Sequence, residues 1–393
     1  MILIFLFWIS IFLVFHTYVL YPLIIQLISK GKKENSKVYT LTDKLPFISV
    51  IMSVHNEELV LVEKIKSLYY TSYPFDKFEV LIGSDASTDG TNKICQIYSE
   101  NYQGFRFYNF NKRRGKPAVI NNLFDEAKGD IIIMTDANVF FDMSTLFELV
   151  KHFANPEISI VGGSISNGET QKAGISFQES AFLSRELKMK YQEGLIWGKT
   201  LGVEGALYAI KRKDFSKVPD NFSVDDFYIT MKVLSQNKKV IMNPKAWGIE
   251  DIRENIKTEF RRKVRISAGN WQNLRSFFHL LWPPWSSLSF AFFSHKVIRW
   301  TGPFLLFLAL ISSFFLAISS PLYFYLLLFQ LFLLIIPLID YFLRFFKIDI
   351  IFLRFVTHFY AMNAALLIGF FKFLFGIKTN VWQPTPRNYG EKD

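Results

Sequence analysis

Carboxylate, amide and basic side chains gather in short clusters along the first two thirds of the chain. The cluster at residues 85–91 places Asp85, Ser87 and Asp89 at alternate positions. Turn and helix-cap chemistry explains Asp89, because short oxygen-bearing side chains favour both. Asp85 directly follows an apolar run, so its carboxylate could hold a base or a ribose through hydrogen bonds.

A basic cluster at residues 111–116 brings four cations and Gly115 to the start of an expected helix. Charge runs of this kind are often no more than a solvated surface. Here the glycine permits close approach of a backbone, and a helix N-terminus favours an anion. Diphosphate recognition and a solvated surface therefore remain two interpretations of Lys116 and its neighbours.

Asp136 and Asn138 follow the apolar residues 131–134. A carboxylate at such a strand end, with a second oxygen ligand two residues on, can hold Mg²⁺ or Mn²⁺ against a diphosphate. The metal would neutralise negative charge that grows on a leaving phosphate. Asn138 is a neutral ligand, so we expect weaker metal binding than two carboxylates would give.

Asp225 and Asp226 open an expected helix over residues 227–236. Acidic residues are common in a first helical turn, because the helix dipole favours negative charge there. Two adjacent carboxylates also repel each other, and partial burial raises a carboxyl pKa further. One of the two could therefore serve as a general base near neutral pH.

The clusters fall at the ends of expected strands. Apolar, β-rich runs at residues 47–54, 78–84, 105–110 and 130–135 each end in a polar cluster, the first of them at 55–58. Helical stretches separate the runs, and this alternation predicts a mostly parallel α/β sheet with right-handed crossovers. Ligands bind at the carboxyl edge of such sheets, so the clusters predict one shared site.

Apolar residues are concentrated at the two ends of the chain. Residues 1–29 carry no Asp, Glu, Lys or Arg, and a helix of that length crosses a hydrocarbon core of roughly 30 Å. A cleaved signal peptide would have a shorter apolar core, so we expect a retained span. Residues 302–339 suggest two spans broken near Pro321, residues 355–371 form a further apolar block, and residues 340–354 predict an interfacial amphipathic helix.

These patterns predict five regions. They are a transmembrane helix at 1–29, a cytosolic α/β domain at 45–275, interfacial helices at 276–301, a transmembrane region at 302–376 and a tail at 377–393. Lysines follow the first span closely, so the positive-inside rule places the middle domain of a multi-pass cell-membrane protein in the cytosol. The basic tail favours the cytosol as well. If both the middle domain and the tail are cytosolic, an even number of spans must lie between them.

The net charge of +11 raises the question of nucleic acid. The cations cluster beside apolar segments, however, as at residues 261–265, where lipid headgroups or a phosphorylated substrate explain them more simply. We therefore expect a lipid bilayer as a partner and no nucleic acid. The single Cys95 excludes an intramolecular disulfide and fits a reducing compartment.

Taken together, the clusters resemble the family 2 glycosyltransferases with a GT-A fold. The ordered set that carries the resemblance is VHNEE, SDASTDGT, RRGKPAVIN, TDAN, VDD and RKVRISAG, within residues 46–269. Weaker likeness extends through SHKVIRW at 294–300 and WQPTPR at 382–387. The chain looks most like the membrane-bound poly-N-acetylglucosamine, hyaluronan and cellulose synthases.

The resemblance implies a nucleotide-sugar donor, with UDP favoured, and a reaction that inverts the anomeric carbon. The implied donor contacts are Asn56, Glu57, Asp85, Ser87, Lys116 and Asp136. Asp136 and Asn138 stand where the family's Asp-x-Asp motif binds a metal. Asp226 stands at the catalytic-base position of the family's Thr-Glu-Asp motif, with Asp225 in place of the Glu. The residues expected to face the acceptor or the diphosphate are Gly205, Arg262, Arg265 and Trp271.

The sequence departs from the family pattern at several positions. Asn138 replaces the second Asp of Asp-x-Asp, and Ser84 stands where many members carry another Asp. The Gln-x-x-Arg-Trp motif of processive members appears here as Arg262-Lys-Val-Arg265-Ile266. Isoleucine cannot stack on an acceptor sugar as tryptophan does, although Trp271 is a nearby substitute.

Three functions are compatible with these observations. The first is an inverting transferase that extends a polysaccharide or another glycan at the membrane. The altered motif at Ile266 favours a second, a non-processive enzyme that acts on a glycolipid or a polyprenyl-linked sugar. The third, a channel or scaffold with a degenerate transferase domain, is disfavoured because Asp85, Lys116, Asp136 and Asp226 are all present.

Overall fold

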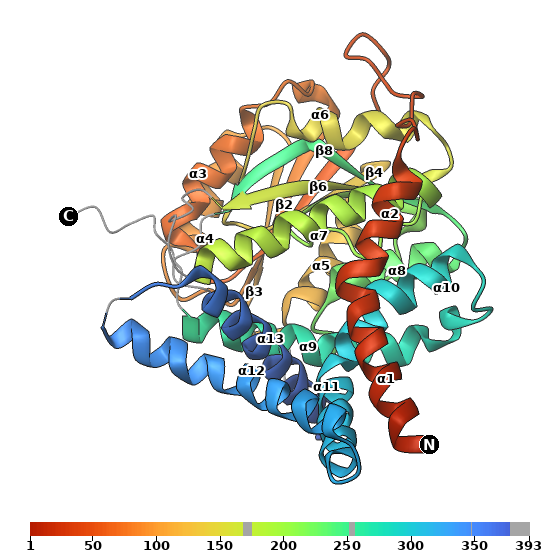
Figure 1. Ribbon diagram of the computed structural model, residues 1–393. Coiled ribbons are helices and arrows are strands. Elements are labelled where there is room, and N and C mark those ends of the chain that lie inside the picture. The colour runs from red at the N-terminus through yellow and green to blue at the C-terminus, as the bar shows by residue number, and fades with distance from the viewer. Residues whose placement is uncertain (168–174, 251–255, 347, 378–393) are drawn as a thin grey trace. The chain divides into compact units, whose positions relative to one another are not determined.

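The computed structural model describes residues 1–167, 175–250, 256–346 and 348–377 (Figure 1). The chain divides into two compact units. The sheet unit comprises residues 28–169, 187–253 and 377–393, and the helical unit comprises residues 1–27, 170–186 and 254–376. The tail motif at 382–387 lies outside the described residues, as does most of the tail predicted at 377–393.

The described part of the sheet unit contains one eight-stranded sheet with the order β3-β2-β1-β4-β7-β6-β8-β5. Its strands are β1 (Ile48–Val54), β2 (Phe78–Asp85), β3 (Phe105–Phe110), β4 (Ile131–Thr135), β5 (Val139–Phe141), β6 (Ile158–Asn167), β7 (Leu207–Lys211) and β8 (Lys239–Glu250). β1 pairs in parallel with β2 and β4, and β2 with β3. β7 is antiparallel to both β4 and β6. The predicted mostly parallel α/β sheet is confirmed.

Helices cover this sheet on both faces. They are α3 (Glu58–Tyr69), α4 (Thr91–Asn101), α5 (Lys116–Glu126), α6 (Thr145–Val150) and α8 (Asp225–Ser235), while α7 (Ile175–Trp197) extends into the helical unit. Right-handed crossovers between β1, β2 and β3 put α3 and α4 on one face. The return from β3 to β4 puts α5 on the other. Val60, Leu61 and Ile65 of α3 pack in the core with alternate residues of β1 and β2.

Gly83 of β2 lets α5 approach the sheet closely. A Cβ at this position would lie 2.5 Å from Val119 Cγ1 and 3.3 Å from Leu123 Cδ1, both on α5. Such distances are shorter than van der Waals contact, so a larger residue would force α5 outwards. Because α5 begins at Lys116, this contact positions the basic cluster that the sequence singled out.

The helical unit carries the apolar ends of the chain. Its helices are α1 (Ile2–Phe15), most of α2 (Tyr21–Ser29), α9 (Ile256–Phe277), α10 (Ser287–Ala291), α11 (Ile298–Ala317), α12 (Pro321–Phe345) and α13 (Ile351–Leu374). Among the described residues, four helical segments are long and apolar enough to cross a membrane: Ile2–Ser29, Ser287–Ala317, Pro321–Phe345 and Ile351–Leu374. The break near Pro321 is where the sequence predicts it, since Pro321 is the first residue of α12.

Two details differ from the sequence-based expectations. The segment expected to be interfacial at 276–301 is continuous helix from Ser287 onwards, and it runs into α11. Residues 340–345 belong to the end of α12 and residues 351–354 to the start of α13, so the helix expected at 340–354 is interrupted at the described residues 346 and 348–350. Their charges pair with each other, with Asp340 lying 2.9 Å from Arg344 and 3.2 Å from Arg354. Among the described residues, three candidate spans follow residue 253. The expected cytosolic tail needs an even number of spans there and stays a prediction.

A buried ion cluster holds the helical unit together at residues 294–300. Glu186 of α7 accepts hydrogen bonds from Lys296 at 2.5 Å and from Arg299 at 2.7 Å, and it lies 2.8 Å from His295 Nε2. Buried charges persist only when they are paired in this way. The cations of the SHKVIRW segment therefore contact an acidic side chain of the same unit.

Candidate active site

The predicted polar clusters meet at one edge of the sheet. The parallel strands β1, β2 and β4 deliver His55, Asp85 and Asp136 at their carboxyl ends. β7 runs the opposite way, with Leu207 opposite Thr135, so the turn that precedes β7 reaches the same edge. That turn contains Gly205, which therefore joins the site from a distant part of the sequence.

Residues 56–58 interlock with the turn that follows β2. The side-chain oxygen of Asn56 accepts a hydrogen bond from the backbone N–H of Thr88 at 2.8 Å, and the backbone N–H of Asn56 donates to Ser87 Oγ at 3.2 Å. The backbone N–H of Glu57 donates to Thr91 Oγ1 at 2.8 Å. Asn56, Glu57 and Ser87, which were predicted to contact the donor, therefore lie together around the turn that follows β2.

Asp85 is buried at the end of β2, with 1% of its surface exposed. Its carboxylate accepts hydrogen bonds from the backbone N–H groups of Arg114 at 2.7 Å and Gly115 at 3.0 Å, and from Arg113 Nε at 3.2 Å. Gly115 has a φ of 83°, a conformation that favours glycine. Asp85 thus fixes the basic loop that leads into α5, and direct contact with a nucleotide stays a prediction.

Lys116 connects this loop to the end of β4. Its ammonium donates to Asp136 Oδ1 at 2.7 Å. Burial alone lowers the pKa of Lys116, but the carboxylates of Asp136, Asp225 and Asp226 outweigh it and raise that pKa above its ordinary value. The structure therefore brings these four predicted residues within electrostatic range of one another, although they come from three separate segments of the chain.

Asp226 lies in the first turn of α8, against Gly205. A Cβ on Gly205 would lie 2.9 Å from Asp226 Oδ2, so only glycine leaves the carboxylate its present place. Burial and the neighbouring Asp225 carboxylate raise the pKa of Asp226 to about 6, while the Phe227 backbone N–H, Lys116 and Lys190 act in the opposite sense. A carboxyl group with this pKa can accept a proton near neutral pH.

Two groups near the base were not predicted. The Tyr208 side chain on β7 is buried, and among the described residues its hydroxyl has no hydrogen-bond partner. Burial and the charges of Asp225, Asp226 and Asp136 raise the pKa of Tyr208, so the hydroxyl stays protonated and can donate. Lys190 of α7 donates to Glu204 Oε1 at 2.7 Å, beside the Gly205 turn.

The sequence holds little signal for either of these groups. Tyr208 lies inside an apolar strand, where an aromatic residue is ordinary. Lys190 lies in a helix whose charged residues suggest a solvated face. Only the pairing of β7 with β4 and the packing of α7 bring both groups near the carboxylates of the site.

The residues at the end of β4 fit a divalent cation only in part. Asn138 Nδ2 donates to Glu250 Oε1 at 3.3 Å, a carboxylate that was not predicted at this position. Among the described residues, no group of three or more His, Cys, Asp or Glu side chains could hold a metal ion. Asp136 and the Asn138 oxygen are hard oxygen ligands, so they could bind Mg²⁺ or Mn²⁺ together with phosphate oxygens of a donor.

The remaining predicted residues belong to the helical unit. Arg262, Arg265 and Trp271 lie on α9, and Arg262 lies 3.7 Å from Glu259. The Trp271 ring packs edge-on against Phe304 and Phe370, with ring centroids 6.2 and 4.8 Å away. This packing gives Trp271 a role inside the helical unit, and its predicted contact with an acceptor stays a prediction.

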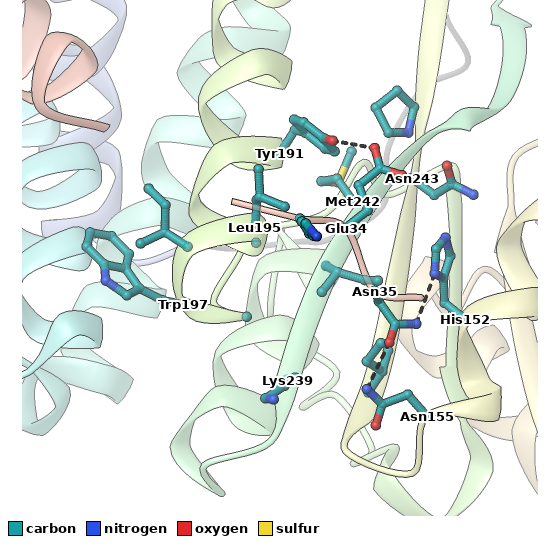
Figure 2. Close-up of a pocket in the computed structure, with 17 residues that line it drawn as sticks. Glu34, Asn35, His152, Asn155, Tyr191, Leu195, Trp197, Lys239, Met242 and Asn243 are labelled. Carbon is teal, nitrogen blue, oxygen red and sulfur yellow. Dashed lines mark hydrogen bonds between the residues drawn. The ribbon is translucent and has the colours of Figure 1, made fainter. Parts of the chain in front are cut away.

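A separate cavity of about 300 Å³ lies at the other edge of the sheet (Figure 2). Lys239, the first residue of β8, and Ile158, the first residue of β6, line it, as do Tyr191 and His152. β6 runs parallel to β4 because both are antiparallel to β7. The amino ends of β6 and β8 therefore lie away from Asp136, which follows the carboxyl end of β4. Asn35 bridges His152 and Asn155 across the cavity, with contacts of 3.3 and 3.0 Å. None of the predicted site residues lines this cavity.

Comparison with known proteins gives a family match for part of the chain. The model of the glycosyl transferase family 2 matches residues 49–218. A Methanococcus voltae protein, dolichyl N-acetyl-alpha-D-glucosaminyl phosphate 3-beta-D-2,3-diacetamido-2,3-dideoxy-beta-D-glucuronosyltransferase, is 24% identical over 60% of this chain and 77% of its own length. The poly-beta-1,6-N-acetyl-D-glucosamine synthase of Staphylococcus epidermidis is 23% identical over 60% of this chain and 57% of its own.

Other curated relatives match over about half of their length. Among solved structures, the mannosyltransferase PcManGT from Pyrobaculum calidifontis, in complex with GDP-Man and Mn²⁺, has a TM-score of 0.72 and 22% identity. The match covers 94% of this chain and 99% of that one, which confirms the expected GT-A fold. The strand-end clusters, the sheet order and these likenesses agree, and residues 49–218 of this chain form a glycosyltransferase domain of family 2.

Proposed function

We propose that this protein is an inverting glycosyltransferase that moves a sugar from a nucleotide donor to a glycan acceptor at the membrane. The observation that carries the proposal is the Asp226 carboxylate, whose pKa is raised to about 6 beside Lys116 and Asp136. A base and a diphosphate-binding cation within one electrostatic environment are what a single-displacement sugar transfer needs. UDP is the nucleotide that the family likeness favours, although PcManGT was solved with GDP-Man.

In the proposed step, the Asp226 carboxylate takes the proton of an acceptor hydroxyl. The resulting oxygen forms a bond to the anomeric carbon of the donor sugar while the bond from that carbon to the diphosphate breaks. The nucleoside diphosphate leaves on the opposite face, so the configuration at the anomeric carbon inverts. Asp225 supports the step indirectly, since its charge contributes to the raised pKa of Asp226.

The charges around Asp136 suit a diphosphate leaving group. The Lys116 ammonium at the N-terminus of α5 would attract the phosphates, and the helix dipole adds to this attraction. Asp136 and Asn138 would hold the cation, which supplies Lewis-acid stabilisation of the leaving phosphate when bound. The Tyr208 hydroxyl, which interacts electrostatically with Asp225, Asp226 and Asp136, could donate a hydrogen bond to a group bound beside them.

Two acceptor classes remain in view. The likeness to a polysaccharide synthase supports a growing glycan chain. Ile266, which stands in place of a stacking tryptophan, supports a single transfer onto a lipid-linked sugar, and the Methanococcus voltae relative is named for a dolichyl phosphate sugar. The four candidate spans in the described part of the chain suit either acceptor at a membrane. We further propose that the sheet unit is cytosolic, where nucleotide sugars are made, and that the spans lie in the cell membrane.

Membranes that contain the full chain should transfer label from one of a panel of radiolabelled UDP- and GDP-sugars. Asp226→Asn should lower the rate by roughly 10²- to 10⁴-fold, the usual contribution of a general base. Asp125→Asn is the matched control, since Asp125 forms an exposed ion pair with Lys217. Full activity in Asp226→Asn would refute the base assignment, and no transfer from any donor would refute the proposed function in favour of a scaffold.

The size of the labelled product should separate the two acceptor classes. We expect product of high mass, extractable only into water, if the enzyme extends a glycan chain. A product that partitions into organic solvent and carries one added sugar would instead identify a lipid-linked acceptor. Digestion of each product with linkage-specific glycosidases provides the control for its composition.

The rate should rise with pH through an apparent pKa near 6, because Asp226 must lose its proton to act as a base. Asp225→Asn removes a repelling charge, which lowers the pKa of Asp226 and should move this acid limb to lower pH. The kcat/KM profile between about pH 4.5 and 8, which brackets a raised carboxyl pKa, measures the shift, with Asp125→Asn as the unshifted reference. An unchanged acid limb would show that Asp225 does not influence the base.

Chelation of divalent cations should abolish transfer, and Mn²⁺ or Mg²⁺ should restore it. Asn138→Asp should lower the metal concentration at half-maximal activity several-fold, because a second carboxylate adds charge to the ligand set. The new carboxylate would face Glu250, so the metal-free variant should also melt at a lower Tm than the wild type. A metal requirement that is the same in both proteins would exclude Asn138 from the cation site.

A further inference from the structure

Lys64 on α3 is a fully buried lysine that none of the predicted clusters contains. Its exposed fraction is 0%, and it lies among the largest enclosed side chains of the sheet unit. An ammonium group in a protein interior is costly unless hydrogen bonds and charges compensate it. The groups that contact the Lys64 ammonium therefore indicate why this lysine is buried.

The Lys64 ammonium bridges the two ends of one short turn. It donates to Thr135 Oγ1 at 2.8 Å and to the backbone carbonyl of Val139. Thr135 is the last residue of β4 and Val139 the first of β5, so the bridged residues flank Asp136, Ala137 and Asn138 on both sides. The ammonium also lies 3.6 Å from the centroid of the Phe141 ring, a cation–π contact.

Ser67, one helical turn further along α3, supports the same segment. Its hydroxyl accepts a hydrogen bond from the backbone N–H of Phe141 at 3.2 Å and donates to the Lys64 carbonyl at 2.8 Å. α3 therefore contacts the chain at Thr135 before the turn, at Val139 directly after it and at Phe141 further on. Within the turn itself, the Val139 N–H donates to the Asp136 carbonyl at 3.3 Å, which is a long bond.

Asp136 stands between two cations. Its carboxylate pairs with the Lys116 ammonium at 2.7 Å, and the Lys64 ammonium interacts with it electrostatically from the core side. A lysine that served only to fill the core would have no reason to approach this carboxylate. Methionine has a similar length and would fill the same space without a charge.

We propose that Lys64 is a positioning residue, which sets the separation of the Asp136 and Asn138 side chains by bridging Thr135 and Val139. Lys64 would then act through the turn on the binding of a metal–diphosphate donor, without touching the donor itself. The inference rests on the proposed function, in which Asp136 and Asn138 take the metal. It adds a residue from α3 that the family motifs do not include.

The test compares Lys64→Met with the wild-type full chain in detergent or membranes. If Lys64 positions the turn, the donor KM, the metal concentration at half-maximal activity and the Kd for UDP with Mn²⁺ by calorimetry should all rise. We expect a rise of roughly 10- to 100-fold, the usual effect of losing support behind metal ligands, with GDP and Mn²⁺ as a parallel probe. The acceptor KM should not change. Lys64→Arg, which keeps the charge and the donors, should recover part of the affinity.

Lys211→Met is the matched control for removing a lysine of this kind. Lys211 also donates to a backbone carbonyl, that of Pro156 at 2.7 Å, and lies 5.9 Å from the Phe153 ring centroid. It pairs with Ile131 at the other end of β4, away from Asp136. The control should keep the wild-type donor KM and the wild-type Kd for UDP with Mn²⁺.

The possible outcomes separate the inference from the function on which it rests. A stable Lys64→Met protein with wild-type donor and metal affinity overturns the inference, provided that the wild type transfers sugar. If the wild type transfers no sugar, the proposed function fails first. Should Lys64→Met fail to fold, Thr135→Val removes one of the two bridged groups and decides in its place. A donor KM that does not rise in Thr135→Val overturns the positioning role.

Discussion

Lys116 is the cation that three carboxylates share at the carboxyl edge of the sheet. Asp136, Asp225 and Asp226 all raise its pKa, and Asp136 contacts it directly. Without a cation among them, three negative charges in a partly buried site would repel each other strongly. The arrangement also leaves Asp226 with a pKa of about 6, because Lys116 offsets only part of the effect of burial and of Asp225. The charge balance that stabilises the site therefore also prepares a base.

Two glycines allow the close packing that brings these charges together. Gly83 lets α5 lie against β2, and α5 carries Lys116 at its first turn. Gly205 leaves room for the Asp226 carboxylate at the start of α8. Asp85 orders the loop before Lys116 through three hydrogen bonds. The site is thus held by its surroundings before any ligand enters, which is what electrostatic preorganisation requires.

The helical unit meets a different constraint, since charged groups near apolar segments need partners of their own. Glu186 joins the cations of residues 295–299, and Asp340 joins Arg344 and Arg354. These pairs explain why residues 340–345 and 351–354 can be part of two long apolar helices although the sequence suggests an interfacial segment. Hydropathy and charge counts treat each residue singly, whereas an ion pair changes the cost of placing both charges in an apolar surrounding.

The order of apolar runs and polar clusters by itself determined the four parallel strands β1 to β4, their carboxyl-edge clusters and the family resemblance. These features are local, because strand periodicity and turn residues depend on near neighbours in the chain. The same order did not predict β5 to β8, of which β7 is antiparallel to β4 and β6. Only the tertiary structure decided that Lys116 pairs with Asp136, that Asp85 binds the loop before α5, and that Tyr208, Lys190 and Lys64 face the site or its support. Each of these depends on which strand pairs with which and on which helix face meets the sheet. Side-chain order along the chain does not specify such contacts, because they join segments tens of residues apart.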